Sequence, residues 1–411
     1  MFTTYRVSPG DTYALIARKL YGDEADAVLL RTANPGHAEP LTPGTTLEVP
    51  ESPAAGSLLQ QQAPADYPDE VAVLIEGARW RFWSEVTWRR AIDTPDTFNL
   101  VVPFDASAID IKETFTPFSY KRIEITVGGE PQFTGYMVNV VPTLAPDSKS
   151  LAVSGYSLPG VMGDCMAPAS SYPLEFKNIN LEKIAGRLAR PFGIKVQFDA
   201  DPGPAFTKAA LDIGQPPLAL LTKLAQQRGL IIGTTERGAL LFTTSADVSS
   251  SRIKLVQGIP PLVSLTPNFN PQQYYSSITG RRPTKVGRPG GQYTVKNTRL
   301  QGVIRPFTFS VDDAEGGTVK TAVEAKAGRM FGNMATYSAE VATWRDAYDE
   351  LLAPNTAIDA TGADAMIYNG YRFLARSVEY RRTAESKSAQ LDLVMPGSFS
   401  GQIPEGLPWD L

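Results

Sequence analysis

The sequence contains almost no cysteine or histidine: among its 411 residues there is one of each. The single cysteine, Cys165, excludes an internal disulfide framework and a cysteine-rich metal site. The single histidine, His37, leaves no second imidazole for an HExxH zinc site and few candidates for a catalytic triad or a general base. We also find no P-loop, no dinucleotide fingerprint and no GxSxG motif. We therefore expect no enzymatic activity, no cofactor and no bound metal.

Long hydrophobic runs and a strong net charge are missing as well. No apolar run approaches the roughly 20 residues that span a bilayer, and the first residues lack the basic and apolar regions of a signal peptide. The net charge of −4 gives the whole chain no attraction to nucleic acid or to an anionic membrane. We expect a protein that is made in the cytosol and contacts no membrane.

Glycine and proline are abundant instead, with 34 and 33 residues. This composition favours a turn-rich protein that is mainly β with α+β parts. A chain of this length also exceeds one ordinary core, so we expect several domains. The predicted segments are a βααβ unit at 1–50, a linker at 51–70, a first β-barrel domain at 71–175, a small inserted α/β domain at 176–248, a second β-barrel domain with a helical insertion at 249–396 and an extended C-terminal arm at 397–411.

The N-terminal unit is predicted from "YRVSPGDTYALIARKLYGD", which combines a short strand, a tight turn and a helix. We assign the N-cap of this helix to Asp11. A second helix, capped by Asp23, ends at "ANPG", and "TPGTTLEVP" predicts the closing strand. The apolar face of the first helix is formed by Tyr13, Ile16, Ala17 and Leu20.

Turn and cap signals locate elements further along the chain. Hairpin turns are predicted at Glu76–Gly77, Gly128–Gly129 and Arg237–Gly238. In the α/β domain, Asn180 is the predicted N-cap of a helix. The helical insertion of the second barrel is predicted near Val319 to Met330.

Two stretches of the predicted barrels resemble each other. "FTGYMVNVVPTLAPDSKSLAVSGY" and "YNGYRFLARSVEYRRTAESKSAQLDLVMP" both contain Gly-Tyr, a polar excursion, a Ser-Lys-Ser turn and a returning strand. This echo pairs Gly135-Tyr136 with Gly370-Tyr371, and Ser148–Ser150 with Ser386–Ser388. Chance likeness between two β-hairpins is the alternative. A true duplication would let three chains present six similar barrels, and so join a threefold assembly to a sixfold tube.

From Val71 to about Ser400 the chain resembles the baseplate hub proteins of contractile-tailed bacteriophages, the Mu-type hub and late control protein D group. The stretches "WSEVTWRRAIDTPDTFNLVV", "LAVSGYSLPGVMGDCMAP" and "FKNINLEKIAGRLARPFGIKV" carry the resemblance. It implies a homotrimeric structural hub of the virion baseplate, assembled in the host cytoplasm. The implied partners are a spike protein on one side and the tail tube and tape-measure proteins on the other, with DNA only passing through the lumen.

Residues 1–50 resemble LysM domains, and most of all the LysM-like tail protein X of such phages. The resemblance implies a shallow groove that binds N-acetylglucosamine polymers in cell-wall proteins. A single LysM copy binds glycan weakly, so we favour docking to neighbouring baseplate wedge proteins. The alternatives are peptidoglycan binding as a tail component and a cell-wall hydrolase, which needs only two carboxylates. The groove residues are Gly10, Asp11, Thr12, Asn34, Pro35 and Leu41.

Two further stretches are candidate contacts. Residues 271–306 contain seven cations, three interleaved tyrosines and no acidic residue. We expect this loop to meet an acidic protein partner or a neighbouring subunit; a solvated loop and a DNA contact are the alternatives. In the C-terminal arm, Trp409 is a candidate anchor on the spike, with disorder as the alternative. The cations that we single out are Arg281, Arg282, Lys285 and Arg288.

The remaining marked residues have ordinary interpretations. Cys165 is expected to be a small buried side chain, because nothing near it in sequence would activate a thiolate. His37 is expected to be exposed beside the NPG turn. The aromatic group formed by Trp80, Phe82, Trp83 and Trp88 is expected in the core or in a subunit interface.

Overall fold

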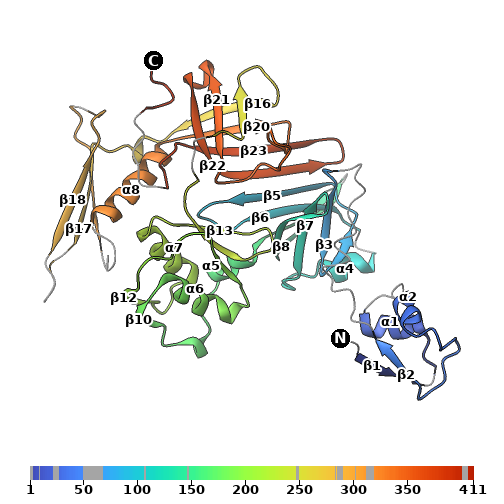
Figure 1. Ribbon diagram of the computed structural model, residues 1–411. Coiled ribbons are helices and arrows are strands. Elements are labelled where there is room, and N and C mark those ends of the chain that lie inside the picture. Colours follow the sequence, from blue (N-terminus) through green and yellow to red (C-terminus); the bar gives the residue numbers. More distant parts are fainter. Residues whose placement is uncertain are drawn as a thin grey trace. The chain divides into compact units, whose positions relative to one another are not determined.

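The computed structural model describes residues 3–8, 10–21, 27–49, 68–105, 108–145, 148–246, 250–282, 284, 290–300, 302–311, 319–399 and 406–411. The chain divides into two compact units: Met1–Glu70 with Val127–Gly129, and Val71–Thr126 with Glu130–Leu411. Strands predominate over helices, so the predicted mainly β fold with α+β parts is confirmed (Figure 1). The predicted cap at Asp23 and most of the predicted linker lie outside the described residues.

The N-terminal unit has the elements β1 (Thr3–Arg6), α1 (Tyr13–Tyr21), α2 (Ala27–Ala33) and β2 (Thr46–Val49), in the predicted order. The two strands pair antiparallel. The predicted N-cap is wrong by one residue, because the Thr12 hydroxyl accepts the Leu15 N–H at 3.2 Å. The Asp11 carboxylate instead accepts bonds from Ser8 N–H and the Tyr5 hydroxyl. The core is formed by Val7, Tyr13, Ile16, Ala17, Leu30, Leu41, Leu47 and Val49.

The second unit is built on one 13-stranded sheet that consists of two halves. The first half-sheet contains β3 (Val71–Ile75), β5 (Glu85–Ala91), β6 (Thr97–Pro103), β7 (Arg122–Val127), β8 (Glu130–Ala145) and β9 (Ser148–Ser157), with the short β4 (Ala78–Trp80) beside β3. The second half-sheet contains β15 (Ile253–Val256), β16 (Leu262–Phe269), β20 (Ala335–Val341), β21 (Ala357–Gly362), β22 (Ile367–Thr383) and β23 (Lys387–Val394).

The two half-sheets share one strand order. Their spatial orders are β5-β6-β9-β8-β7-β3 and β16-β20-β23-β22-β21-β15, so equivalent strands follow each other in the same order along the chain. One pairing differs in direction. β15 runs parallel to β21, whereas the bonds from Glu76 N–H to Arg122 O and from Gly128 N–H to Glu70 O make β3 antiparallel to β7.

The registers of the two long hairpins agree as well. In the first, the pairing of β8 with β9 shifts by one residue at Val138. In the second, the pairing of β22 with β23 shifts at Arg376. The Ser-Lys-Ser part of the predicted echo therefore superposes in register. The Gly-Tyr part is wrong, because Tyr136 opposite Tyr156 corresponds to Leu374 opposite Val394, and not to Tyr371.

The two halves join where β22 pairs antiparallel with β5, from Ser377 opposite Ala91 to Thr383 opposite Glu85. A buried aromatic group lies at this joint. The Trp88 ring stacks on Tyr380 with centroids 4.8 Å apart and meets Trp344 edge-on at 5.3 Å. Burying three large rings in one group stabilises the joint strongly.

An α/β insertion follows β9. Asn180 caps its first long helix as predicted, since Asn180 Oδ1 accepts the Lys183 N–H at 3.1 Å. The predicted turn at Arg237–Gly238 lies between two antiparallel strands. Its elements are α5 (Val161–Asp164), β10 (Glu175–Ile179), α6 (Leu181–Ala189), β11 (Val196–Phe198), β12 (Phe206–Ala210), α7 (Pro217–Gln227), β13 (Ile231–Thr234) and β14 (Leu240–Thr243).

A second insertion lies between β16 and β20. It contains the sheet β18-β17-β19 and a helix, α8, that begins at Val319 as predicted but continues to Met334. Figure 1 shows α8 between this small sheet and the main one. The strands are β17 (Ser277–Arg282), β18 (Gly291–Lys296) and β19 (Pro306–Ser310). Short helical turns complete the second unit: α4 (Ile109–Thr114), η2 (Leu158–Gly160), η3 (Ala169–Ser171), η4 (Arg190–Phe192), η5 (Pro271–Gln273) and η6 (Ala363–Ala365).

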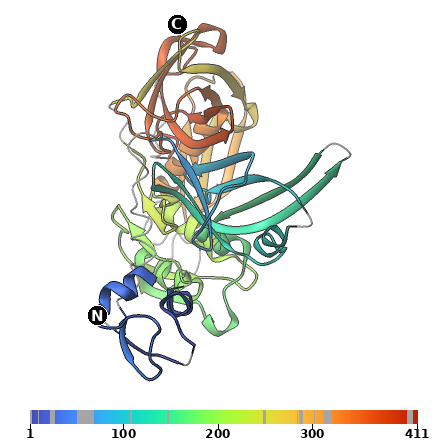
Figure 2. The same ribbon diagram turned by 90° about the vertical axis from the view of Figure 1, so that its right-hand side faces the viewer.

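The two ends of the main sheet's strands differ. At one end lie the turns of the β8–β9 and β22–β23 hairpins, and we call this end the tip rim. At the other end both insertions leave the sheet, after β9 and after β16, and we call it the insertion rim. Figure 2 shows the β8–β9 hairpin extending beyond its neighbouring strands.

Candidate docking surfaces

The predicted groove residues of the N-terminal unit fall into two groups. Gly10, Thr12 and Pro35 are exposed. The other three are buried: Asp11, Asn34 and Leu41. The exposed group is available to a ligand, whereas the buried group has structural partners.

Asn34 uses its whole side chain to hold the unit together. Its Nδ2 donates to Leu30 O at 2.8 Å and to Glu48 O at 2.7 Å, and its Oδ1 accepts the Glu48 N–H at 2.8 Å. The amide therefore ties α2 to β2 with three bonds. Since a buried amide with satisfied bonds gains nothing from a new partner, Asn34 is a structural residue here.

The loop after α2 is fixed to α1 through Tyr13. The Tyr13 hydroxyl donates to His37 O at 2.7 Å, and the Tyr13 N–H donates to Glu39 Oε1 at 2.7 Å. Burial and the Glu39 carboxylate raise the pKa of Tyr13. The His37 side chain itself is exposed, as expected. Gly10, Thr12 and Pro35 are thus exposed on loops of a unit whose α1 and following loop are held together by the Tyr13 bonds.

The cationic segment forms part of the second insertion. Arg281 is exposed and Arg282 is half-buried, and both line an open depression of about 800 Å³ together with Thr308 and Ser310. Lys285 and Arg288 lie outside the described residues. The three tyrosines of this segment pack with the α8 core, so they form no open stacking surface; they are Tyr274, Tyr275 and Tyr293.

The C-terminal residues fold back on their own chain. The Trp409 ring meets Phe269 edge-on with centroids 5.2 Å apart. The Asp410 carboxylate accepts two bonds from Arg299, each 2.8 Å long, and these bonds lower the pKa of Asp410. Leu407 is buried in the α8 core. Trp409 therefore lies half-buried against the end of β16.

Two strand edges of the main sheet carry exposed apolar side chains. The outer half of β8 exposes Val141 and Leu144, with 82% of Leu144 accessible. The end strand β16 exposes Val263 and Phe269. Among the described residues neither the outer half of β8 nor the outer edge of β16 has a strand partner. Exposed apolar edges of this kind are contact surfaces or aggregation sites.

Each of these edges also carries a proline, Pro142 in β8 and Pro267 in β16. The bond from Phe104 N–H to Lys149 O shows that the backbone N–H and C=O groups of odd-numbered β9 residues point toward β6. Pro142 lies opposite one of them, Leu151, so its own backbone groups point away from β9, to the open edge. The bond from Asn270 N–H to Met334 O does the same for Pro267. Proline without an N–H blocks uncontrolled strand addition. These edges were missed in the sequence, although proline inside a strand pattern is an edge signal.

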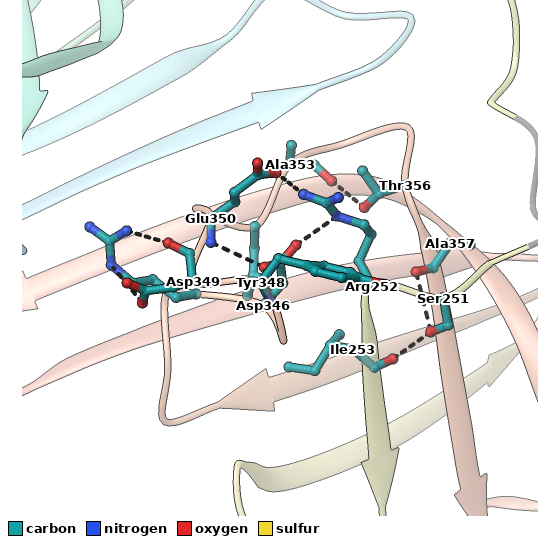
Figure 3. Close-up of polar contacts among 12 residues, drawn as sticks. Ser251, Arg252, Ile253, Asp346, Tyr348, Asp349, Glu350, Ala353, Thr356 and Ala357 are labelled. Atoms are coloured by element: carbon teal, nitrogen blue, oxygen red, sulfur yellow. Dashed lines mark hydrogen bonds and ion pairs between the residues drawn. The ribbon is translucent and has the colours of Figure 1, made fainter.

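The loop between β20 and β21 is held by an ionic cluster on the second half-sheet. Arg252 Nε lies 2.6 Å from an Asp346 oxygen, and its guanidinium also bonds Glu350 and covers the Tyr348 ring (Figure 3). Asp346 Oδ1 accepts the Tyr348 and Glu350 N–H groups. The Glu350 and Asp346 carboxylates raise the pKa of Arg252. The cluster fixes one loop of the tip rim.

A buried polar group joins the first half-sheet to the α/β insertion. Asp96 Oδ1 accepts the Ala91 N–H at 2.9 Å, and the Ser157 hydroxyl bonds both Asp96 N–H and Thr234 Oγ1, at 3.1 Å each. Burial raises the pKa of Asp96 to about 7, although Arg90 opposes the shift. Arg90 in turn pairs with a Glu236 oxygen at 2.6 Å.

Side-chain exposure bears on two smaller predictions. Cys165 is exposed, so the expectation of a buried side chain is wrong. The reason is its position directly after α5, where the chain leaves the insertion's core. Trp88 is fully buried, as expected for a core position. Phe82 is 69% exposed, so for this ring a subunit interface stays the prediction. In the part of the chain that the structure describes, no group of acidic, cysteine and histidine residues could hold a metal, and no helix is long and apolar enough to cross a membrane.

Part of the chain is similar in sequence to a known phage protein. Residues 159–244 match the family described as baseplate hub protein gp44-like, second domain. The chain is 26% identical over 142 residues to the baseplate hub protein gp44 of Escherichia phage Mu, which covers 34% of this chain and 37% of that protein. The chain therefore aligns with little more than a third of this curated relative.

Solved structures share the fold over a longer stretch. The 43 kDa tail protein of prophage MuSo2 from Shewanella oneidensis has a TM-score of 0.68 at 22% identity, covering 80% of this chain and 99% of that one. The tail protein from Neisseria meningitidis MC58 has a TM-score of 0.65 at 19% identity, covering 82% and 99%. These two structures show a shared fold, and the matches to gp44 and to the gp44-like family confirm the resemblance to Mu-type baseplate hub proteins. These relatives are described as tail and baseplate proteins.

Proposed function

We propose that this chain, a relative of the Mu-type baseplate hub proteins, is the structural hub of a contractile phage tail, and that three copies form a ring between a sixfold tail tube and a threefold spike. The observation that carries the proposal is the duplicated half-sheet. Six strands occur twice in one spatial and chain order. Three such chains supply six similar units, which is what a threefold ring needs to match a sixfold one.

The joint inside one chain indicates how neighbouring copies meet. Within the chain, β22 of the second half-sheet lies beside β5 of the first. The strands at equivalent positions on the two open sides are β8 and β16. Both expose apolar side chains along these edges. We infer that β8 of one copy lies beside β16 of the next, so that the ring repeats a contact that already exists once in every chain.

The pairing register of β22 with β5 predicts which residues of β8 and β16 lie beside each other. Equivalent residues of the two half-sheets follow from the matching pairings of β8–β9 with β22–β23 and of β5–β6 with β16–β20. By this equivalence, the pairs Thr383–Glu85 and Val378–Arg90 of the joint correspond to Ala145 beside Ser264 and Val140 beside Phe269 in the contact between two copies. The same transfer brings Pro142 opposite Pro267. Two facing prolines have no N–H to exchange, so we expect side-chain packing to dominate this contact instead of a continuous ladder.

The two half-sheets resemble each other at the tip rim more than at the insertion rim. At the tip rim both half-sheets present a hairpin turn, β8–β9 and β22–β23. At the insertion rim β5 and β6 are joined by residues 92–96, whereas β16 and β20 are joined by residues 270–334. We therefore assign the tip rim to the sixfold tube and the insertion rim to the threefold spike.

The N-terminal unit is proposed to dock to neighbouring wedge proteins. Two of its polar groove residues, Asp11 and Asn34, are occupied by internal bonds. The exposed remainder is small and mostly backbone, around Gly10, Thr12 and Pro35. A pull-down on purified cell-wall sacculi, with the full chain and a variant lacking 1–50, tests this assignment. If the sacculi retain the full chain but not the variant lacking 1–50, glycan binding is favoured.

The oligomeric state tests the hub proposal. Sedimentation and native mass spectrometry of the full chain should give a species of three times 44.5 kDa at high concentration. Leu144→Glu should shift this species toward monomer, because it places a charge in an apolar contact. Ile213→Glu is the matched control, since Ile213 is 92% exposed but lies in the α/β insertion. A chain that stays monomeric at all concentrations, alone and with its spike, contradicts the proposal.

A further inference from the structure

The small sheet β18-β17-β19 has one covered and one uncovered face. On the covered face, Ile278 and the aromatic and aliphatic side chains of the outer strands pack toward Val323 of α8. Those of the outer strands are Tyr293, Val295, Phe307 and Phe309. Because successive strand residues alternate between faces, the residues between them form the opposite face.

The opposite face is polar and cationic. The pairing registers align its residues in three rows across the strands. The central row is linked by a 2.9 Å contact between the Thr279 and Thr294 hydroxyls. The face offers hydroxyl, amide and cationic groups and no carboxylate. Its rows are Lys296, Ser277 and Pro306; Thr294, Thr279 and Thr308; and Gln292, Arg281 and Ser310.

Its two cations, Arg281 and Lys296, differ from Arg299 and Arg305 of the same segment. Arg299 is engaged by Asp410, and Arg305 donates to Pro271 O and Tyr274 O. Arg281 and Lys296 are exposed, and no ion pair to either occurs among the described residues. Four residue steps along the strands separate their rows, roughly 13 Å at the usual rise. Two positive charges at this spacing suit an extended anionic chain.

We propose that this face binds an acidic segment of another protein. Guanidinium and ammonium groups bond carboxylates strongly, and the hydroxyls and the Gln292 amide can bond a peptide backbone. A protein fits better than a nucleic acid, because bases need exposed aromatic side chains for stacking. The aromatic rings here pack on the covered face. The depression beside Arg281, about 800 Å³ in volume, would receive one carboxylate side chain.

The test uses the full chain and a fluorescently labelled decaglutamate peptide, with binding followed by anisotropy at low salt. Arg281→Glu with Lys296→Glu should weaken binding at least tenfold, and Arg281→Gln with Lys296→Gln should weaken it less. Lys208→Glu with Lys254→Glu is the matched control, because both lysines are exposed and lie on other sheets. Circular dichroism confirms that each variant is folded.

Three results would overturn the proposal. The first is that Lys208→Glu with Lys254→Glu weakens peptide binding as much as Arg281→Glu with Lys296→Glu does. The second is tighter binding of a 20-nucleotide single strand that is lost in Arg281→Glu with Lys296→Glu, which would make the face a nucleic-acid surface. The third concerns Asp312, Asp313 and Glu315, which follow β19 in the sequence. If the peptide binds only after these three are neutralised, the chain's own acidic run is the occupant.

Discussion

Val138 and Arg376 occupy equivalent positions in the two half-sheets. Each is the residue at which a long hairpin shifts its register by one. Each lies ten residues before the first serine of a Ser-Lys-Ser turn, Ser148 or Ser386. A bulge is a local feature that the pairing of two strands does not require. Its repetition at one distance from the turn therefore favours duplication over chance likeness between two hairpins.

The joint between the half-sheets should depend on Trp88. Its ring is fully buried between Tyr380 and Trp344. Trp88→Ala should lower the free energy of unfolding by about 3–5 kcal/mol, the usual cost of removing a buried aromatic side chain. Urea unfolding followed by circular dichroism measures the loss. Phe82→Ala, at a 69% exposed ring, is the control and should cost about 0.5 kcal/mol or less. Equal effects would show that the joint is not a core.

Asp96 should make the stability of the second unit depend on pH. Burial raises its folded pKa to about 7, above the ordinary 3.8. Between these values the folded chain keeps a proton that the unfolded chain has lost, so stability should fall as pH rises from about 4 to 7. Asp96→Asn keeps the acceptor for Ala91 N–H and cannot ionise.

Urea midpoints at pH 5 and pH 8 check this expectation. The wild type should lose more stability between the two than Asp96→Asn does. The other charged groups near this site, Asp93, Glu236, Arg89 and Arg90, are common to both proteins, so the comparison isolates Asp96. Asp110→Asn, at an exposed position, should behave as the wild type. Parallel pH profiles for wild type and Asp96→Asn would contradict the burial argument.

Asn34 should hold β2 of the N-terminal unit. Its three side-chain bonds reach Leu30 and Glu48. Asn34→Ala should destabilise the unit by about 2 kcal/mol, because it removes three side-chain bonds and leaves the Glu48 N–H and C=O without the partner that ties them to α2. Hydrogen exchange in the full chain should show faster exchange at residues 46–49. His37→Ala removes an exposed side chain and should leave these amides protected. Unchanged protection in Asn34→Ala would mean that the amide is free to serve a ligand.

The C-terminal residues should protect the end of β16. Deleting residues 406–411 removes the buried Leu407, the Trp409–Phe269 contact and the Arg299–Asp410 pair. We expect a loss of about 2–3 kcal/mol, mainly from the buried leucine and the aromatic pair. Hydrogen exchange at β16 should rise. Unchanged exchange together with lost spike binding would favour Trp409 as an anchor on a partner, as expected from the sequence.

Much of the fold was predictable because it depends on local chemistry. The Asn180 cap, the turn at Glu76–Gly77 and the turn at Arg237–Gly238 need only short stretches of sequence, and all are present. The Asp11 cap failed because Thr12 follows it directly and offers the same kind of oxygen one position nearer the helix. Sequence alone could not choose between two adjacent cap residues.

Long-range pairing was the harder part. The sequence echo found both hairpins but aligned Tyr136 with Tyr371, because a repeated Gly-Tyr outweighed the spacing to the turn. The joint between β22 and β5 brings together residues almost 300 positions apart, and no local pattern records such a pairing. The open edges follow from that joint, so they too could be placed only with the structure.

The most direct test of the ring is a disulfide between two copies. Ala145→Cys with Ser264→Cys, in a Cys165→Ser background, should oxidise to a covalently closed species of three chains, resolved by mass spectrometry under denaturing conditions. Ala145→Cys with Asn268→Cys, displaced by four residues along β16, should not. If the chains assemble in threes while the first pair stays reduced, the edge assignment is wrong; if they never assemble, the hub account itself is contradicted.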